Sequence, residues 1–366
     1  MGQLPAAVVT CAPIEFVVPA GIDDPARPSG GNHYDRRVIE SLTAMDREVH
    51  EHRVGDVADL GPLLAGLPDG AVVVLDGLLG SAAPGALEPV SGRLRVVVLL
   101  HMPFAEAATD ESVRRSERAA LAAASGVVTT SDWARGWVVR HHGLPTDRVS
   151  VAKPGVDPAP VSWAFPPGGR LMCLAAVTQD KGHDTLVAAL AQIADLDWVL
   201  TCVGATDLEP DFVAELADTA QGAGIGDRVE FTGPLTGDPL GFALDNADLL
   251  VSASRRESFG MAVTEALARG VPVVVTDVGG HGEAVGGTTA GERAGVLVPP
   301  DDPDRLAAAL RCWLTDRDHR ERLRAAARDR RTTLASWEDT ARLLAAAVDA
   351  TPLEPIVVRD TTRAAR

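Results

Sequence analysis

Glu257 and Glu265 are two carboxylates eight residues apart, and both could bind the same ligand. Glu257 follows the apolar run 249–251, and Glu265 lies about two turns inside a predicted helix with apolar residues at helical spacing. Unpaired amides at the start of that helix favour a phosphate, and carboxylates accept hydrogen bonds from sugar hydroxyls. The pair could therefore hold the two ends of a nucleotide sugar. The alternative interpretation is a helix-start acid and a solvated helix face.

Lysine is scarce in this chain, because only Lys153 and Lys181 among its 34 Lys and Arg residues are lysines. Lys181 lies in a loop between a predicted strand, 171–177, and a predicted helix, 185–193. An ammonium group there could pair with a diphosphate and stabilise a departing nucleotide. A solvated loop lysine is the alternative.

His101 directly follows the apolar run 96–100, at the carboxyl end of a predicted strand. An imidazole there could donate to a sugar hydroxyl or stabilise charge near an anomeric carbon. It could instead cap the last carbonyls of the strand. His141 and His142 lie in a helix-to-turn segment and are predicted to be solvated.

Gly30 and Gly31 end a polar loop after the first predicted strand, 14–20, and precede a predicted helix, 34–43. Paired glycines before a helix let a phosphate or sugar approach the backbone amides closely. A plain turn is the alternative interpretation.

Strands and helices alternate along the whole chain, which indicates parallel, doubly wound sheets of the α/β class. In such sheets ligands bind beyond the carboxyl ends of the strands. Further strands are predicted at 48–54, 71–75, 95–100, 126–130, 198–203, 228–233, 271–276 and 295–299. Further helices are predicted at 110–124, 211–221 and 305–349. A Pro- and Gly-rich stretch, 158–169, separates the two halves.

Composition narrows the class of protein further. The net charge of −17 argues against nucleic acid or an anionic membrane surface as the main partner. The four cysteines, at 11, 173, 202 and 312, form no CxxC pair, so neither a zinc site nor a disulfide framework is indicated. No basic-then-apolar leader and no apolar run of eighteen residues occurs, which predicts a cytoplasmic protein.

The stretch around the two carboxylates resembles a known family. Glu257 and Glu265, with Ser258-Phe259-Gly260 between them and Gly270-Val-Pro-Val-Val after, resemble the E-x7-E signature of retaining glycosyltransferases of family 4. Lys-Gly-x-Asp-x-Leu at 181–186 and Pro154-Gly155-Val156-Asp157 resemble two further segments of that family. The resemblance implies the GT-B fold, with two Rossmann-like domains facing a central cleft.

The resemblance also implies roles for the residues that match. Glu265 would bind the ribose, Glu257 would orient the donor sugar, and Lys181 would bind the diphosphate. His101 and the loop with Gly30 and Gly31 would face the donor from the first domain. The remaining expected donor-binding residues are Ser258, Phe259, Gly260 and Met261 at the helix start, and Gly233 near the base.

One position departs from the family pattern. Many members have an Arg five residues before the diphosphate-binding Lys, where this chain has Ala176. The second positive contact must come from elsewhere, with Arg255 and Arg256 as candidates, or is missing. The DxD-like segments at 195–197 and 316–318 are interpreted as ordinary turns, so no metal and no cofactor is expected.

The expected organisation is a first, acceptor-side domain over 1–160, a second, donor-side domain over 170–345, and a tail over 346–366 that crosses to or lies on the first domain. The predicted function is transfer of a sugar, with retention, from a UDP- or GDP-sugar to a small-molecule, lipid or glycan acceptor. Two alternatives stay open. One is a GT-B-like epimerase or phosphorylase, and the other is a non-catalytic sugar-nucleotide-binding or scaffold protein.

Overall fold

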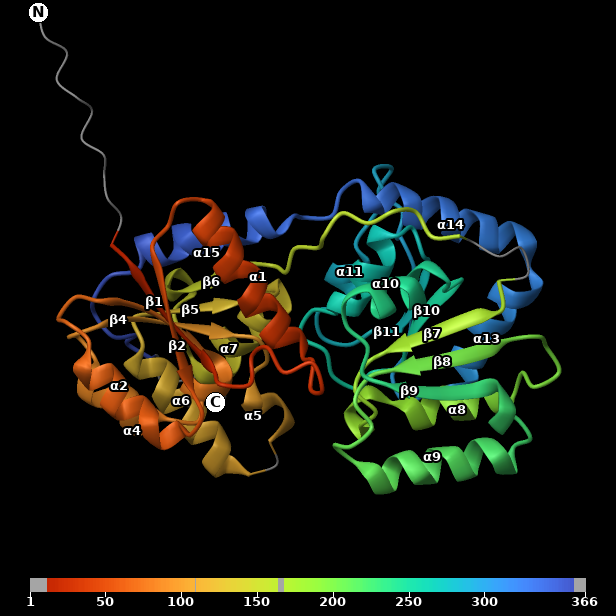
Figure 1. Ribbon diagram of the computed structural model, residues 1–366, viewed down its shortest axis with the longest axis horizontal. Coiled ribbons are helices and arrows are strands. Elements are labelled where there is room, and N and C mark those ends of the chain that lie inside the picture. Colours follow the sequence, from red (N-terminus) through yellow and green to blue (C-terminus); the bar gives the residue numbers. More distant parts are fainter. Residues whose placement is uncertain (1–11, 109, 164–167, 359–366) are drawn as a thin grey trace, which may run out of the picture.

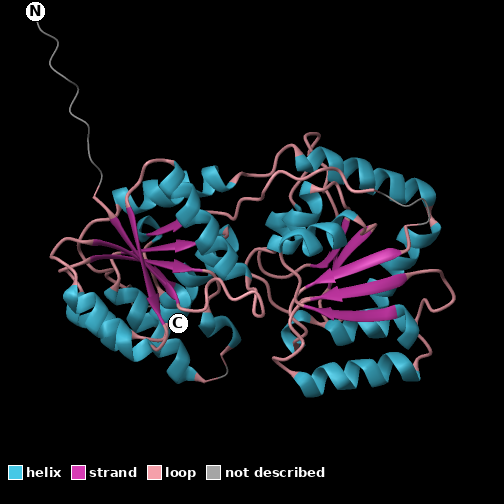
Figure 2. Cartoon of the chain, viewed as in Figure 1, coloured by secondary structure: helices cyan, strands magenta, loops and turns pink. Residues whose placement is uncertain are grey.

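The computed structural model describes residues 12–358 except 109 and 164–167, and it consists of two α/β domains, each with its own parallel sheet (Figures 1 and 2). The first sheet has the order β2-β1-β3-β4-β5-β6, and the second has the order β12-β11-β10-β7-β8-β9. Every strand pair is parallel. The predicted pair of Rossmann-like, doubly wound domains is therefore confirmed.

Most of the strands are short and apolar, as expected for parallel strands covered by helices on both faces. The edge strand β2 is an exception, because its sequence is VHEHRV. The first sheet contains β1 (Ile14–Pro19), β2 (Val49–Val54), β3 (Val72–Asp76), β4 (Arg95–Leu100), β5 (Gly126–Thr129) and β6 (Val149–Val151). The second contains β7 (Arg170–Leu174), β8 (Val199–Val203), β9 (Val229–Gly233), β10 (Leu249–Ser252), β11 (Val273–Thr276) and β12 (Val296–Val298).

Helices cover both faces of each sheet (Figure 2). Those of the first domain are α1 (Gly30–Ala44), α2 (Leu60–Gly66), α3 (Gly77–Gly80), α4 (Pro84–Leu87), α5 (Phe104–Ala107), α6 (Glu111–Ala123) and α7 (Asp132–His142). The chain then forms α8 (His183–Ala191), α9 (Pro210–Gly222), α10 (Gly237–Asp245), α11 (Met261–Ala268), α12 (His281–Val285), α13 (Pro303–Thr315), α14 (Arg317–Arg331) and α15 (Trp337–Ala350).

The last helix belongs to the first domain, because α15 packs beside α1 and its apolar face joins the core over β1. The chain crosses back between α14 and α15, beside the outgoing connection, where the Val156 amide donates to the Ala335 carbonyl (3.0 Å). The boundary expected at residue 345 therefore falls inside α15, so the crossing comes earlier than predicted. Residues 353–356 lie on α6, since the Ile356 amide donates to the carbonyls of Ala122 and Ala124. Residues 359–366 of the expected tail lie outside the described chain.

Several predicted boundaries are wrong for local reasons. Helix α1 begins at Gly30, because the Ser29 hydroxyl accepts from the Asn32 amide and caps it, so both glycines belong to the helix rather than preceding it. Strand β7 ends at Leu174 instead of 177.

The prediction that His142 is solvated is also wrong, because His142 is buried against Glu117 (2.8 Å).

Candidate functional site

Lys181 and Glu257 meet at the edge of the second sheet where the strand order reverses. Lys181 ends a short 3-10 turn after β7, and Glu257 lies in the loop after β10, the strand beside β7. The Lys181 Nζ donates to the Glu257 Oε2 at 2.8 Å. Their side chains are 27% and 19% exposed, so the pair is open to a ligand without being fully solvated. Ligands of doubly wound sheets bind at this reversal.

The pair is held in its charged form. Burial alone raises the pKa of Glu257, but Lys181 and the nearby His281 outweigh it and hold the pKa below its usual value. Burial alone lowers the pKa of Lys181, and Glu257 reverses that effect. The ammonium and the carboxylate therefore neutralise each other, and an anionic ligand would compete with Glu257 for Lys181.

The loop that carries Glu257 rests on a tight turn at Gly279. The Gly280 amide donates to the Glu257 carbonyl at 2.9 Å. Gly279 has φ +52°, and a Cβ there would lie 1.7 Å from the same carbonyl oxygen. A side chain at position 279 would therefore displace the loop, so the glycine fixes where Glu257 stands.

Helix α11 begins at Met261, with Gly260 as its N-cap residue. Phe259 and Gly260 thus precede the helix instead of opening it as predicted, and Ser258 lies in the same loop. Phe259 is buried in the core of the second domain, so only its backbone could face a ligand. Among the described residues, no backbone hydrogen bond uses the amide of Met261, which remains available at the positive end of the helix.

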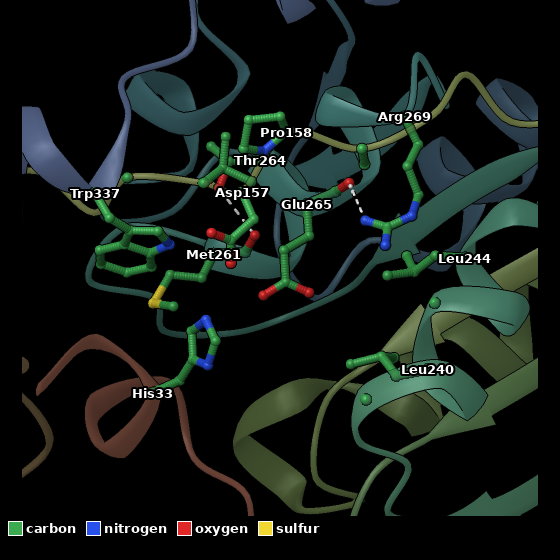
Figure 3. Close-up of a pocket in the computed structure, with 15 residues that line it drawn as sticks. His33, Asp157, Pro158, Leu240, Leu244, Met261, Thr264, Glu265, Arg269 and Trp337 are labelled. Atoms are coloured by element: carbon green, nitrogen blue, oxygen red, sulfur yellow. Dashed lines mark hydrogen bonds between the residues drawn. The ribbon is translucent and has the colours of Figure 1, made fainter. Parts of the chain in front are cut away.

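Glu265 lines a cavity of about 160 Å³ between the domains (Figure 3). The second domain contributes residues of α10 and α11, including Met261, and the first domain contributes His33 and Trp337. The segment 155–159, which connects the domains, completes the wall. Trp337 is 4% exposed and its Nε1–H has no partner among the described residues.

The pKa of Glu265 is raised to about 7, mainly by burial. The positive charge of Arg269 opposes this shift, and the negative charge of Asp157 adds to it. Arg269 cannot neutralise the carboxylate by direct contact. Its Nε donates to Asp245 (3.0 Å), and its Nη1 donates to the backbone carbonyl of Glu265. The carboxylate thus faces the cavity as an acceptor without a paired cation.

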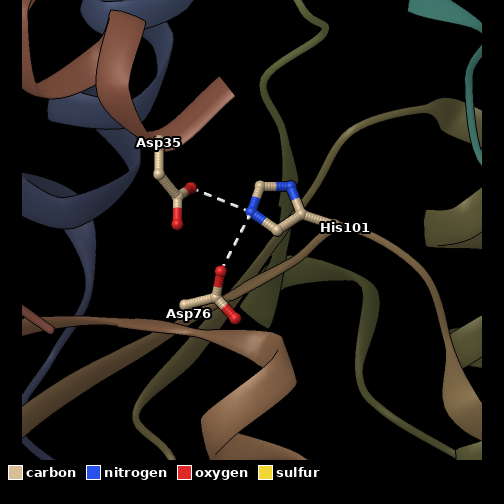
Figure 4. A group of neighbouring side chains, drawn as sticks. All are labelled: Asp35, Asp76 and His101. Atoms are coloured by element: carbon tan, nitrogen blue, oxygen red, sulfur yellow. Dashed lines mark hydrogen bonds and ion pairs between the residues drawn. The ribbon is translucent and has the colours of Figure 1, made fainter. Parts of the chain in front are cut away.

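His101 directly follows β4, where the sequence places it, and its ring is bound by two carboxylates that the sequence analysis missed (Figure 4). The Nε2 atom lies 2.8 Å from the Asp35 Oδ1 and 3.5 Å from the Asp76 Oδ2. The ring therefore does not cap the carbonyls of the strand. The signal for Asp76 was present, since it is the polar residue that ends the apolar strand β3.

The first turn of α1 connects His101 with the second domain. A Cβ on Gly31 would lie 3.2 Å from the His101 Cδ2, and one on Gly30 would lie 3.6 Å from the Met261 Sδ. The two glycines thus lie where the domains approach each other. Gly233 ends β9 but does not line the cavity around Glu265.

The two arginines proposed to replace the absent Arg at Ala176 are engaged elsewhere. Arg255 binds Asp184 (2.9 and 2.8 Å) and Asp301 (2.7 Å), and Arg256 binds Asp180. Neither arginine bonds to the Lys181–Glu257 pair. The DxD-like acids are also engaged: Asp195 pairs with Arg311, and Asp316 caps α14.

A carboxylate from the second domain caps a helix of the first. Glu283 in α12 accepts from the amides of Asp132 (3.0 Å) and Trp133 (2.8 Å) in the first turn of α7. Lys153 bridges Asp132 (2.7 Å) and Glu283 (2.9 Å). These contacts join the two domains. No helix in the described part of the chain has both the length and the apolar character to cross a membrane.

Comparisons with known proteins agree with this architecture. Residues 167–330 match the family described as glycosyl transferases group 1, and residues 71–160 match glycosyltransferase family 4. A D-inositol 3-phosphate glycosyltransferase of Jonesia denitrificans is 33% identical over 215 residues, covering 53% of this chain and 50% of the relative. A lipopolysaccharide core mannosyltransferase of Rhizobium meliloti is 32% identical over 182 residues, covering 48% and 50%. The chain thus spans about half the length of these relatives.

Solved structures with the same fold cover nearly the whole chain. Sucrose-phosphate synthase from Thermosynechococcus elongatus has a TM-score of 0.76 at 24% identity, covering 92% of this chain and 98% of that one. Anabaena HepE, solved with UDP and glucose, has a TM-score of 0.72 at 18% identity, covering 93% and 100%. The two family models match residues in both domains and both describe glycosyltransferases, and the chain has the GT-B fold of these solved structures.

Proposed function

We propose that this chain transfers a sugar, with retention, from a UDP- or GDP-sugar to a small-molecule, lipid or glycan acceptor. The observation that carries the proposal is the Lys181–Glu257 pair at the strand reversal of the second sheet. It supplies one cation for a diphosphate and one carboxylate for sugar hydroxyls at the same place. HepE, whose structure contains UDP and glucose, has the same fold.

Donor binding would divide among three groups. Lys181 would turn from Glu257 to the diphosphate. The Met261 amide, at the start of α11, would also donate to the diphosphate. Glu257, released from Lys181, would accept from hydroxyls of the donor sugar. Glu265 would accept from the ribose hydroxyls, because its carboxylate faces the cavity without a direct cation partner.

In the reaction, the bond between the anomeric carbon and the β-phosphate oxygen breaks. A bond to the acceptor oxygen forms on the same face of the sugar, and the departing phosphate oxygen takes the acceptor proton. Lys181 and the helix amide would stabilise the charge that develops on the diphosphate, which is the work that a metal ion does in other enzymes. No metal is needed in this proposal.

The names of the relatives bear on the acceptor. The relatives named for inositol 3-phosphate and the one named for lipopolysaccharide core differ in acceptor. What the two groups have in common is glycosyl transfer itself.

A second candidate is a non-catalytic protein that binds sugar nucleotides. One observation favours it: Ala176 replaces the family Arg, and Arg255 and Arg256 are engaged with carboxylates. Such a protein would bind the donor through Lys181 but would stabilise the departing diphosphate poorly.

Turnover distinguishes the two candidates. UDP-glucose and GDP-mannose are incubated with an acceptor panel, with and without EDTA, and release of nucleoside diphosphate is followed. Proton NMR of the product reports the anomeric configuration. Release that persists in EDTA, with retention, supports the proposal, and Lys181→Met should reduce it by about 10²–10³-fold. Binding without release would favour the second candidate, and an inverted product would refute the mechanism.

A further inference from the structure

A buried cluster of two carboxylates and one imidazole lies at the strand reversal of the first sheet. Asp76 is the last residue of β3, and His101 follows β4. Asp35 lies in α1, the helix after β1, and the strand order reverses between β1 and β3. Three separate elements therefore bring these side chains together at the edge where doubly wound sheets bind ligands.

The cluster is nearly closed to solvent. Asp35 is 0% exposed and Asp76 is 2% exposed. The Asp76 Oδ1 accepts from the Leu78 amide, whereas the Asp35 Oδ2 has no partner among the described residues. Buried carboxylates are costly unless a cation or hydrogen bonds compensate them. His101 is the cation that faces both.

The charges of the three groups are coupled. Burial alone lowers the pKa of His101, but Asp35 and Asp76 outweigh it and raise the pKa to about 10. Burial raises the pKa of Asp35 to about 7. The pKa of Asp76 stays below its usual value despite burial, because His101 is beside it. Among the described residues, Tyr34 makes a ring contact with His101, and its hydroxyl donates to the Ala152 carbonyl.

The ring has little freedom to turn. Tyr34 packs edge-on against it, with centroids 5.2 Å apart, and Gly31 lies against its face. The Thr130 hydroxyl donates to the His101 carbonyl. Figure 4 shows the second ring nitrogen, Nδ1, on the side away from both carboxylates, and it makes no hydrogen bond with a described residue.

We propose that Asp35, together with Asp76, is a positioning residue. The two carboxylates hold the Nε2–H of His101, so that its Nδ1–H points to the donor sugar. That the ligand is a donor sugar rests on the proposed function. The cluster carries a net charge of −1 with Asp35 ionised and of zero with Asp35 protonated. In either state it can donate to a hydroxyl without placing net positive charge near the anomeric carbon. The carboxylates thus make a protonated histidine compatible with glycosyl transfer.

A bound cation is the competing explanation, because the three ligand atoms lie within 4.8 Å of one another. Ligands about 2.1 Å from a tetrahedral ion stand about 3.4 Å apart. The 2.8 Å between the His101 Nε2 and the Asp35 Oδ1 is instead the length of a charge-assisted hydrogen bond. We therefore assign a proton, and not a metal, to this contact.

Histidine NMR tests the proposal without any substrate. The full chain is labelled with ¹⁵N-histidine, and the His101 signal is identified by its loss in His101→Gln. Asp35→Asn keeps the shape and an acceptor oxygen but removes a charge, so the proton affinity of His101 should fall by about 10- to 1000-fold. Glu117→Gln is the matched control, because it removes the charge from another buried carboxylate–histidine contact of 2.8 Å. It should leave the His101 titration in place.

Adding UDP-glucose completes the test. The proposal expects the Nδ1 signal to move in the wild type, and kcat in Asp35→Asn to fall more than KM rises. An unchanged His101 titration in Asp35→Asn, or a stoichiometric metal whose removal by EDTA moves the His101 signals, would overturn the proposal. A titration that shifts as expected in a chain that binds no nucleotide sugar would overturn the proposed function instead. It would leave the charge coupling intact.

Discussion

The ionisation of Glu265 makes a quantitative prediction about donor binding. Burial raises its pKa to about 7, so the carboxylate gains a proton as the pH falls through neutrality. A protonated carboxyl group is a poorer acceptor for ribose hydroxyls. If only the ionised form binds, the apparent Kd scales with the inverse of the ionised fraction, about 1.1-fold at pH 8 and about 11-fold at pH 6. Affinity for UDP-glucose should therefore weaken about tenfold, or about 1.4 kcal/mol, between these two pH values.

Isothermal titration calorimetry with UDP-glucose measures this effect. The ligand is a diphosphate diester and does not itself titrate in this range. His33, which also lines the cavity, has a pKa lowered by burial, so it carries less charge in this range than a solvated histidine. Glu265→Gln should bind about 10- to 100-fold more weakly at pH 8, because hydrogen bonds to a charged acceptor are lost. Its affinity should then be nearly independent of pH.

The matched control is Glu215→Gln, which changes an exposed glutamate on α9 of the same domain. It should keep both the affinity and the pH dependence of the wild type. A pH dependence that survives in Glu265→Gln would belong to another group, such as Asp35, whose pKa is also about 7. That result would refute the assignment of Glu265 to the ribose.

Two further predictions concern the charges around the cleft. Lys181→Met should weaken UDP-glucose binding at least tenfold by calorimetry, because the diphosphate loses its cation while the Glu257 carboxylate beside it stays. Lys153→Met, which changes the other lysine of the sequence, should stay within about twofold, and equal losses would contradict the role of Lys181. Glu283→Gln should loosen the contact with the first turn of α7 and increase the radius of gyration measured by small-angle scattering, and an unchanged radius would refute the domain contact.

Most of the parallel strands were predictable from the sequence because they are apolar runs whose extent depends on local residues; β2, with the sequence VHEHRV, is an exception. The placement of His101 and Lys181 at strand ends followed from the same pattern, since a polar residue after a buried strand must emerge at the carboxyl edge. The helix starts were less predictable. Ser29 caps α1, which begins four residues before the predicted start, and that depended on one hydroxyl contact.

The partners of the site residues were not predictable, because they come from distant parts of the chain. Asp35 and His101 are separated by 66 residues, and Lys181 and Glu257 by 76. Asp35 also looks like an ordinary helix residue until α1 is packed against β3 and β4. Arg255 and Arg256 show the converse case. Their position near Glu257 suggested a contact with the diphosphate, but they pair instead with Asp184 in α8 and with Asp180.

Thermal unfolding with a panel of UDP-, GDP-, ADP- and dTDP-sugars tests the central claim, that the cleft binds a nucleotide sugar through Glu265, most directly. A ligand at a hundred times its Kd stabilises the folded chain by about 2.7 kcal/mol, which corresponds to about 3–4 °C for a protein of this size. The account predicts such a rise with one nucleotide series and its loss in Glu265→Ala. No rise with any member of the panel, or an equal rise in the variant, would contradict it.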